Sequence, residues 1–125
     1  MTSPAQLAAM QTIDLQLAHV WMVRAFLKHS DEAQEDDELA EVHRELYDYM
    51  LALGASYKAG DAAEYLRVAR KKYAKLKRAS EQFVLIQPEI SSHTNFQMAV
   101  ASLRAAVAAI GQELETKGSG VFGDD

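Results

Sequence analysis

Four side chains with acid–base or ligand-binding chemistry lie on or beside apolar helical patterns: Asp14, His19, His43 and Arg104. Histidine titrates near neutral pH, so His19 and His43 would suit proton transfer or ligand binding if the fold brought them together. A histidine at the flank of an apolar face is more often a structural hydrogen-bonding residue. Asp14 and Arg104 suit either a ligand pocket or ion pairs at a subunit boundary. These four residues are the predicted ligand-binding candidates, and no catalytic residue is predicted.

The sequence has no pattern typical of a metal or cofactor site. It contains no cysteine, which excludes thiolate zinc sites and cysteine nucleophiles. Helical bundles that bind two iron ions place a Glu-x-x-His pair on each of two helices, and this chain has no such pair. Glu41, His43 and Glu45 are spaced two apart and therefore do not share a helix face. We predict no bound metal and no cofactor.

Helices are the elements that must position these residues. Apolar residues recur at steps of three and four, the spacing of amphipathic helices. Stop and start signals divide this pattern into four helices at about residues 4–29, 36–53, 62–86 and 93–115, with Gly54 ending the second, Pro88 following the third, and Ser91 or Ser92 capping the fourth. The sequence predicts an all-α domain over residues 1–116, an antiparallel up-down four-helix bundle. The Gly-rich residues 117–125 are predicted to form a mobile tail.

Charge is concentrated in the middle of the chain. Residues 31–48 carry nine acids and one base, whereas residues 58–78 carry eight bases and two acids. Two neighbouring helices with complementary charge explain this contrast, and a basic patch for an acidic partner is the alternative. The net charge of −5 opposes nucleic-acid binding, which requires Lys and Arg to neutralise phosphates.

The first and last helices carry few charges and are apolar on more than one side. A helix of this kind needs a partner beyond its main apolar stripe. We therefore predict a symmetric homodimer through these two helices, with interface residues Leu15, Met22, Phe26, Ala101, Ala105 and Ala108.

The segment from Glu38 to Met50, followed by Lys58 to Ala62, resembles the last helical hairpin of flagellar export chaperones. The resemblance is confined to this hairpin and implies chaperone-like binding of a helical segment. The same hairpin resembles a tetratricopeptide unit, but nothing in the chain repeats at the period that such units require.

Three functions follow as hypotheses. The first is a non-catalytic, homo-oligomeric interaction or adaptor protein. The second is a ligand- or metal-binding bundle, or a small enzyme, that uses His19 and His43. The third is a chaperone-like binder of a helical or acidic segment through the basic helix. We predict a cytoplasmic protein without a membrane span, because charged residues interrupt the most apolar helix.

Overall fold

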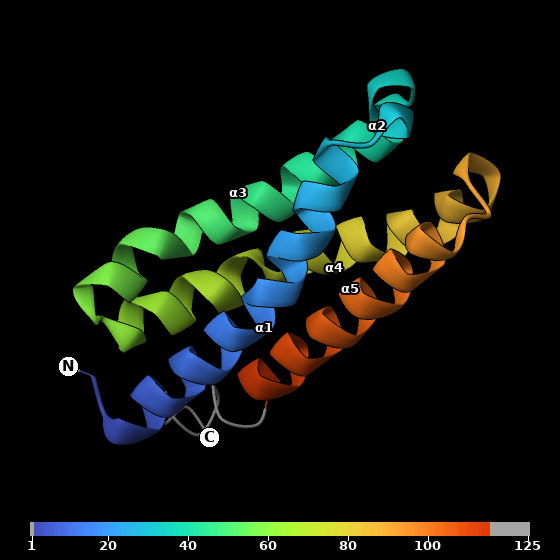
Figure 1. The fold of residues 1–125 in the computed structure, drawn as a ribbon. Helices are drawn as coiled ribbons and strands as arrows, with labels where there is room; N and C mark the ends of the chain where they lie inside the picture. The colour runs from blue at the N-terminus through green and yellow to red at the C-terminus, as the bar shows by residue number, and fades with distance from the viewer. Residues whose placement is uncertain (1, 116–125) are drawn as a thin grey trace.

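Residues 2–115 are described by the computed structural model, and this part of the chain is helical without strands (Figure 1). The helices are α1 (Pro4–Lys28), α2 (Asp31–Glu35), α3 (Asp37–Ala59), α4 (Ala62–Ile90) and α5 (Thr94–Glu113). The prediction of an all-α fold is confirmed. Residues 116–125, which include the predicted tail, lie outside the described residues.

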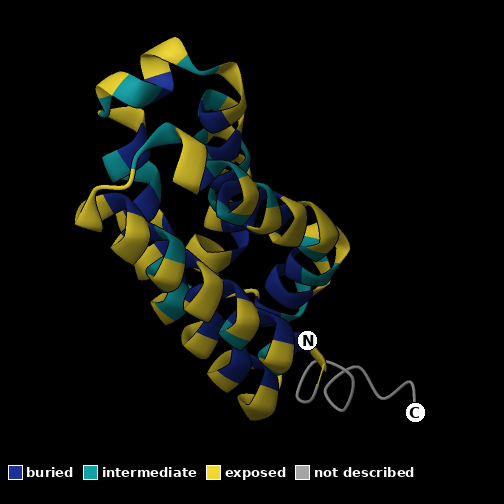
Figure 2. Ribbon diagram, turned by 90° about the vertical axis from the view of Figure 1, so that its right-hand side faces the viewer, coloured by how far each residue is buried: buried dark blue, intermediate teal, exposed yellow. Residues whose placement is uncertain are grey.

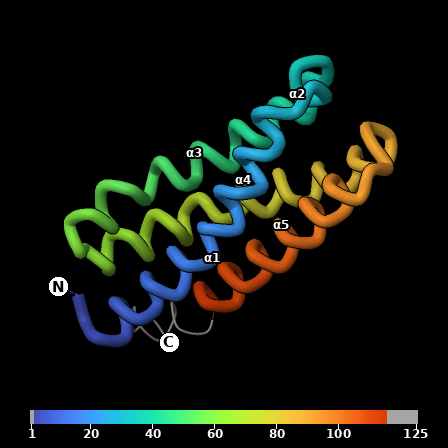
Figure 3. Tube along the Cα trace, viewed as in Figure 1, coloured from blue at the N-terminus to red at the C-terminus, as the bar shows by residue number. Residues whose placement is uncertain are grey.

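Four long helices surround one core, and α2 is a short turn of helix between α1 and α3 (Figure 3). α1 packs against α3, α4 and α5, while α4 packs against α3 and α5. Each long helix has a buried side and an exposed side (Figure 2). The largest fully buried side chains are Tyr65, Phe83, Ile13, Leu27, Leu39, Leu46, Leu53, Leu66, Leu76, Leu103, Ile110 and Val20.

Side-chain caps fix where the helices begin. Ser3 forms a capping box with Gln6, in which each side chain bonds the other residue's backbone N–H. Asp36 and Asp61 accept hydrogen bonds from the third residue of α3 and of α4. α5 is capped by His93, whose Nδ1 accepts the backbone N–H of Asn95 at 3.0 Å, and not by the serines that the sequence suggested.

Gly54 does not end the second long helix as predicted. α3 continues through it to Ala59 and ends at Gly60, whose φ of 69° is left-handed. Glycine inside a helix costs only about 1 kcal/mol relative to alanine, so packing of the next turn can outweigh it. Ser56 provides that packing, since it is buried and its hydroxyl donates to the Leu53 carbonyl.

Pro88 does not end the third long helix either. α4 extends to Ile90, with Pro88 inside its last turn. A proline inside a helix removes one backbone hydrogen bond and crowds the preceding turn, and only the first turn of a helix tolerates it without this loss. Buried Gln87 closes the turn by donating from Nε2 to the Ser91 carbonyl at 2.7 Å.

Candidate interaction surface

Asp14 is held by a buried tyrosine of another helix. Its carboxylate accepts a hydrogen bond of 3.1 Å from the Tyr65 hydroxyl, which joins α1 to α4. Burial, followed by the charge of Asp14, raises the pKa of Tyr65 above its ordinary value. Asp14 is therefore a hydrogen-bonded link between two helices in this structure.

The other three ligand-binding candidates lie on three different helices. His19 is exposed on α1 and Arg104 is exposed on α5, whereas His43 is half-buried on α3. Burial and then the nearby cations Arg44, Arg24 and Lys28 lower the pKa of His43. None of Asp14, His19, His43 and Arg104 lines the cavities described below.

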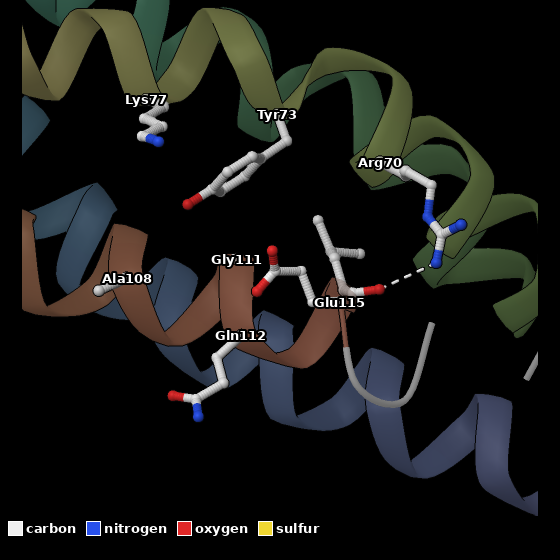
Figure 4. A pocket seen from close by; sticks show the side chains of 8 residues that line it. Arg70, Tyr73, Lys77, Ala108, Gly111, Gln112 and Glu115 are labelled. Atoms are coloured by element: carbon white, nitrogen blue, oxygen red, sulfur yellow. Dashed lines mark hydrogen bonds between the residues drawn. The ribbon is translucent and has the colours of Figure 1, made fainter. Parts of the chain in front are cut away.

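A cavity of about 630 Å³ lies between α4 and α5 (Figure 4). The Tyr73 hydroxyl donates to the Val107 carbonyl at 3.0 Å, and Arg70 Nη2 donates to the Leu114 carbonyl at 2.9 Å. A Cβ atom on Gly111 would collide with the Tyr73 hydroxyl, so any larger residue here requires Tyr73 to shift. In this region, side chains of α4 are therefore hydrogen-bonded to backbone carbonyls at the C-terminal end of α5.

The acidic side of α3 faces the basic side of α4. Their shared groove is lined by Glu38, Glu41, Val42, Glu45, Lys75, Arg78, Ala79 and Gln82. Lys75 Nζ lies 4.0 Å from a Glu45 oxygen, and Gln82 donates to Glu38 at 2.7 Å. Three basic residues of α4, namely Lys72, Lys75 and Arg78, thus border the acids of α3. This contact accounts for part of the charge contrast in the sequence.

α1 presents an unusually apolar exposed side to its surroundings. Leu15 and Met22 are 71% and 67% exposed, and Ala18 is exposed between them. The spacing of three and then four places these residues in one row along the helix. Between Ala5 and Met22 no exposed residue of α1 is Asp, Glu, Lys or Arg.

α5 carries a matching row on its outer side. Ala101, Ala105 and Ala108 are exposed, and Met98 extends the row with 58% of its side chain exposed. Arg104 is the only charged residue among the exposed residues from Thr94 to Gln112. The opposite side of the helix is buried in the core, so the alanine row faces away from it.

The two rows belong to helices that lie side by side (Figure 1). Phe26 of α1 packs edge-on against Phe96 of α5, with ring centroids 5.0 Å apart. Phe26 is therefore half-buried inside the chain and exposes only part of its ring. We call the surface formed by Leu15, Ala18, Met22, Met98, Ala101, Ala105 and Ala108 the α1–α5 face. Ala108, at the end of the row, also lines the cavity between α4 and α5.

A second surface feature, which the sequence analysis did not predict, lies between α1 and α3. The Arg24 guanidinium carbon lies 5.0 Å from the centroid of the Trp21 ring and 4.4 Å from that of Tyr47. Trp21 and Arg24 are three residues apart on one helix, and this spacing alone predicts that their side chains are neighbours. Tyr47 comes from another helix, so its part in the arrangement could be seen only in the structure.

No group of three His, Cys, Asp or Glu residues within 2–115 is arranged to hold a metal ion. None of the described helices combines the length and the apolar character needed to cross a membrane. No family model, curated protein or solved structure matches the chain. The function is therefore inferred from the surfaces of this molecule.

Proposed function

We propose that this chain is a non-catalytic, homo-oligomeric interaction protein and that two copies pair through the α1–α5 face. The absence of Asp, Glu, Lys and Arg from the exposed side of α1 between Ala5 and Met22 is the observation that carries the proposal. Monomeric proteins rarely expose contiguous apolar patches larger than a few hundred Å², and such large patches commonly mark interaction sites. The apolar row of α5 widens the surface beyond a single helix.

The proposal includes an antiparallel up-down arrangement of α1, α3, α4 and α5. Contacts between helix starts and ends support it. Phe26 near the end of α1 meets Phe96 near the start of α5, and Gln82 late in α4 bonds Glu38 early in α3. Neighbouring helices of this kind give α1 and α5 a two-helix face that a second copy can match by two-fold symmetry.

The chemistry of the face fits a second copy of the same surface. Alanines on α5 allow a facing helix to come close, while Leu15, Met22 and Met98 supply large apolar side chains. Full burial of a leucine or methionine is worth about 1.5–3 kcal/mol. In a two-fold dimer each such residue is buried twice, so a few large side chains provide a substantial driving force.

A matched pair of glutamate variants tests this proposal. Leu15 on the α1–α5 face and Leu85 on α4 are both 71% exposed. We expect Leu15→Glu to convert the dimer to a monomer, because two carboxylates would be buried at an apolar contact. Leu85→Glu adds the same charge away from the face and should leave the dimer intact. Light scattering coupled to size exclusion measures both masses.

Circular dichroism melts of both variants serve as the folding control, since both positions are exposed in the single chain. A Leu15→Glu protein that remains a dimer while folded would contradict the use of this face. Loss of the dimer in Leu85→Glu alone would place the interface on α4.

A further inference from the structure

The α1–α3 surface carries an arginine stacked between two exposed aromatic rings. Trp21 is 47% exposed and Tyr47 is 37% exposed, and the Arg24 guanidinium lies against both. A guanidinium over an aromatic face is attracted by the ring quadrupole, so these contacts favour the arrangement of the three groups. We call this group the Trp21–Arg24–Tyr47 stack.

The stack lies within a cluster of cations that lack carboxylate partners. Lys28 on α1 and Arg44 on α3 are exposed, and both act electrostatically on His43 together with Arg24. Among the described residues, none of these three cations is in an ion pair. The Nε atom of Arg24 is buried and has no hydrogen-bond acceptor within residues 2–115. This Nε atom is closed off from solvent, so carboxylates of a partner would pair mainly with Lys28 and Arg44, which are exposed.

We propose that the Trp21–Arg24–Tyr47 stack, with Lys28 and Arg44, binds an acidic peptide segment of a partner protein that carries carboxylates beside an apolar side chain. The cations complement the carboxylates, and the two rings offer apolar area to the neighbouring side chain. Trp, Tyr and Arg are also the residues most enriched where protein interfaces concentrate their binding energy.

A short acidic peptide fits this surface better than nucleic acid does. Arg44 is followed on α3 by Glu45 and Asp48 and preceded by Glu41, so an extended phosphate backbone would run over carboxylates. A short segment meets fewer of these carboxylates, and its apolar side chain can pack on the Trp21 and Tyr47 rings.

The site is distinct from the α1–α5 face. At 100° per residue, Trp21 lies about 100–120° around α1 from Met22 and Leu15. Arg24 contacts Tyr47 of α3, whereas Phe26 contacts Phe96 of α5. Trp21 is three residues from Ala18 at the edge of the α1–α5 face, whereas Arg24 reaches Tyr47 of α3. The mass of the protein and its peptide binding test the two proposals separately.

The only tryptophan of the chain reports on the site directly, because Trp21 belongs to the stack. The probe is the capped peptide Glu-Asp-Leu-Glu-Asp, and its control is the same peptide with Gln and Asn in place of the acids. We expect a saturable change of Trp21 emission with the acidic peptide and about tenfold weaker binding of the amide peptide. Lys28→Gln and Arg44→Gln should each weaken binding about threefold.

Lys71→Gln is the matched control, because Lys71 is exposed on α4 and its substitution removes the same charge. Weakening of the same size in Lys71→Gln would overturn the proposal, as would an unchanged Trp21 emission up to about 1 mM acidic peptide. Equal competition by a short oligothymidylate would instead assign a general polyanion surface. Emission that changes with protein concentration without peptide would make a second copy the occupant.

Discussion

Histidine side chains in this molecule take different roles according to their surroundings. His93 caps α5 through Nδ1, whereas His43 is half-buried beside three cations. Both burial and like charge disfavour the imidazolium, so the pKa of His43 is lowered. Because the pKa of His43 is lower in the folded state, the unfolded state binds more protons at mildly acidic pH. The free energy of unfolding therefore decreases as the pH falls below about 6.5.

The electrostatic part of this shift can be measured at one residue. Of the three nearby cations, Arg44 lowers the pKa of His43 the most, and its side chain is exposed. We expect Arg44→Gln to raise the pKa of His43 toward its ordinary value. Proton NMR titration of the imidazole measures this change. The control Lys71→Gln should leave the titration of His43 unchanged. A His43 midpoint that stays fixed in Arg44→Gln would show that burial alone sets its pKa.

Two glycines show how packing decides the role of the same residue type within a helix. Gly54 lies in α3 with no atom near the position of a Cβ, while Gly111 in α5 is in contact with Tyr73. We expect Gly54→Ala to raise the free energy of unfolding by about 1 kcal/mol, because alanine is the better helix former. We expect Gly111→Ala to lower it by about 1–3 kcal/mol, because the added methyl must displace Tyr73.

Urea denaturation of both variants measures this difference in sign. Equal effects of the two substitutions would mean that helix propensity outweighs the contact between α4 and α5. The same comparison tests whether the hydrogen bond from Tyr73 to the Val107 carbonyl holds these helices in place.

The sequence predicted the helices far better than their ends. Apolar spacing located the long helices because it follows the side that packs on the core. The ends at Gly54 and Pro88 were placed too early, since those signals describe local preference alone. Whether a helix continues past them depended on Leu53, Ser56 and Gln87, whose burial is decided by the neighbouring helices.

At the scale of the whole molecule, charge and apolar surface are separated. The acids of α3 and several bases of α4 face one another, and α1 and α5 present low-charge surfaces. Helical spacing was enough to select Leu15, Met22 and the alanine row as exposed candidates. It could not reveal the Trp21–Arg24–Tyr47 stack or the bond between Asp14 and Tyr65, because both join residues from different helices.

Sedimentation equilibrium of the unmodified protein tests pairing through the α1–α5 face most directly. At a concentration on the order of 10 µM, typical for stable dimers, we expect a mass of twice the 13.8 kDa chain. The dimer should persist in high salt, because the proposed contact is apolar and is not screened. A single species of 13.8 kDa at this concentration would contradict the proposed function.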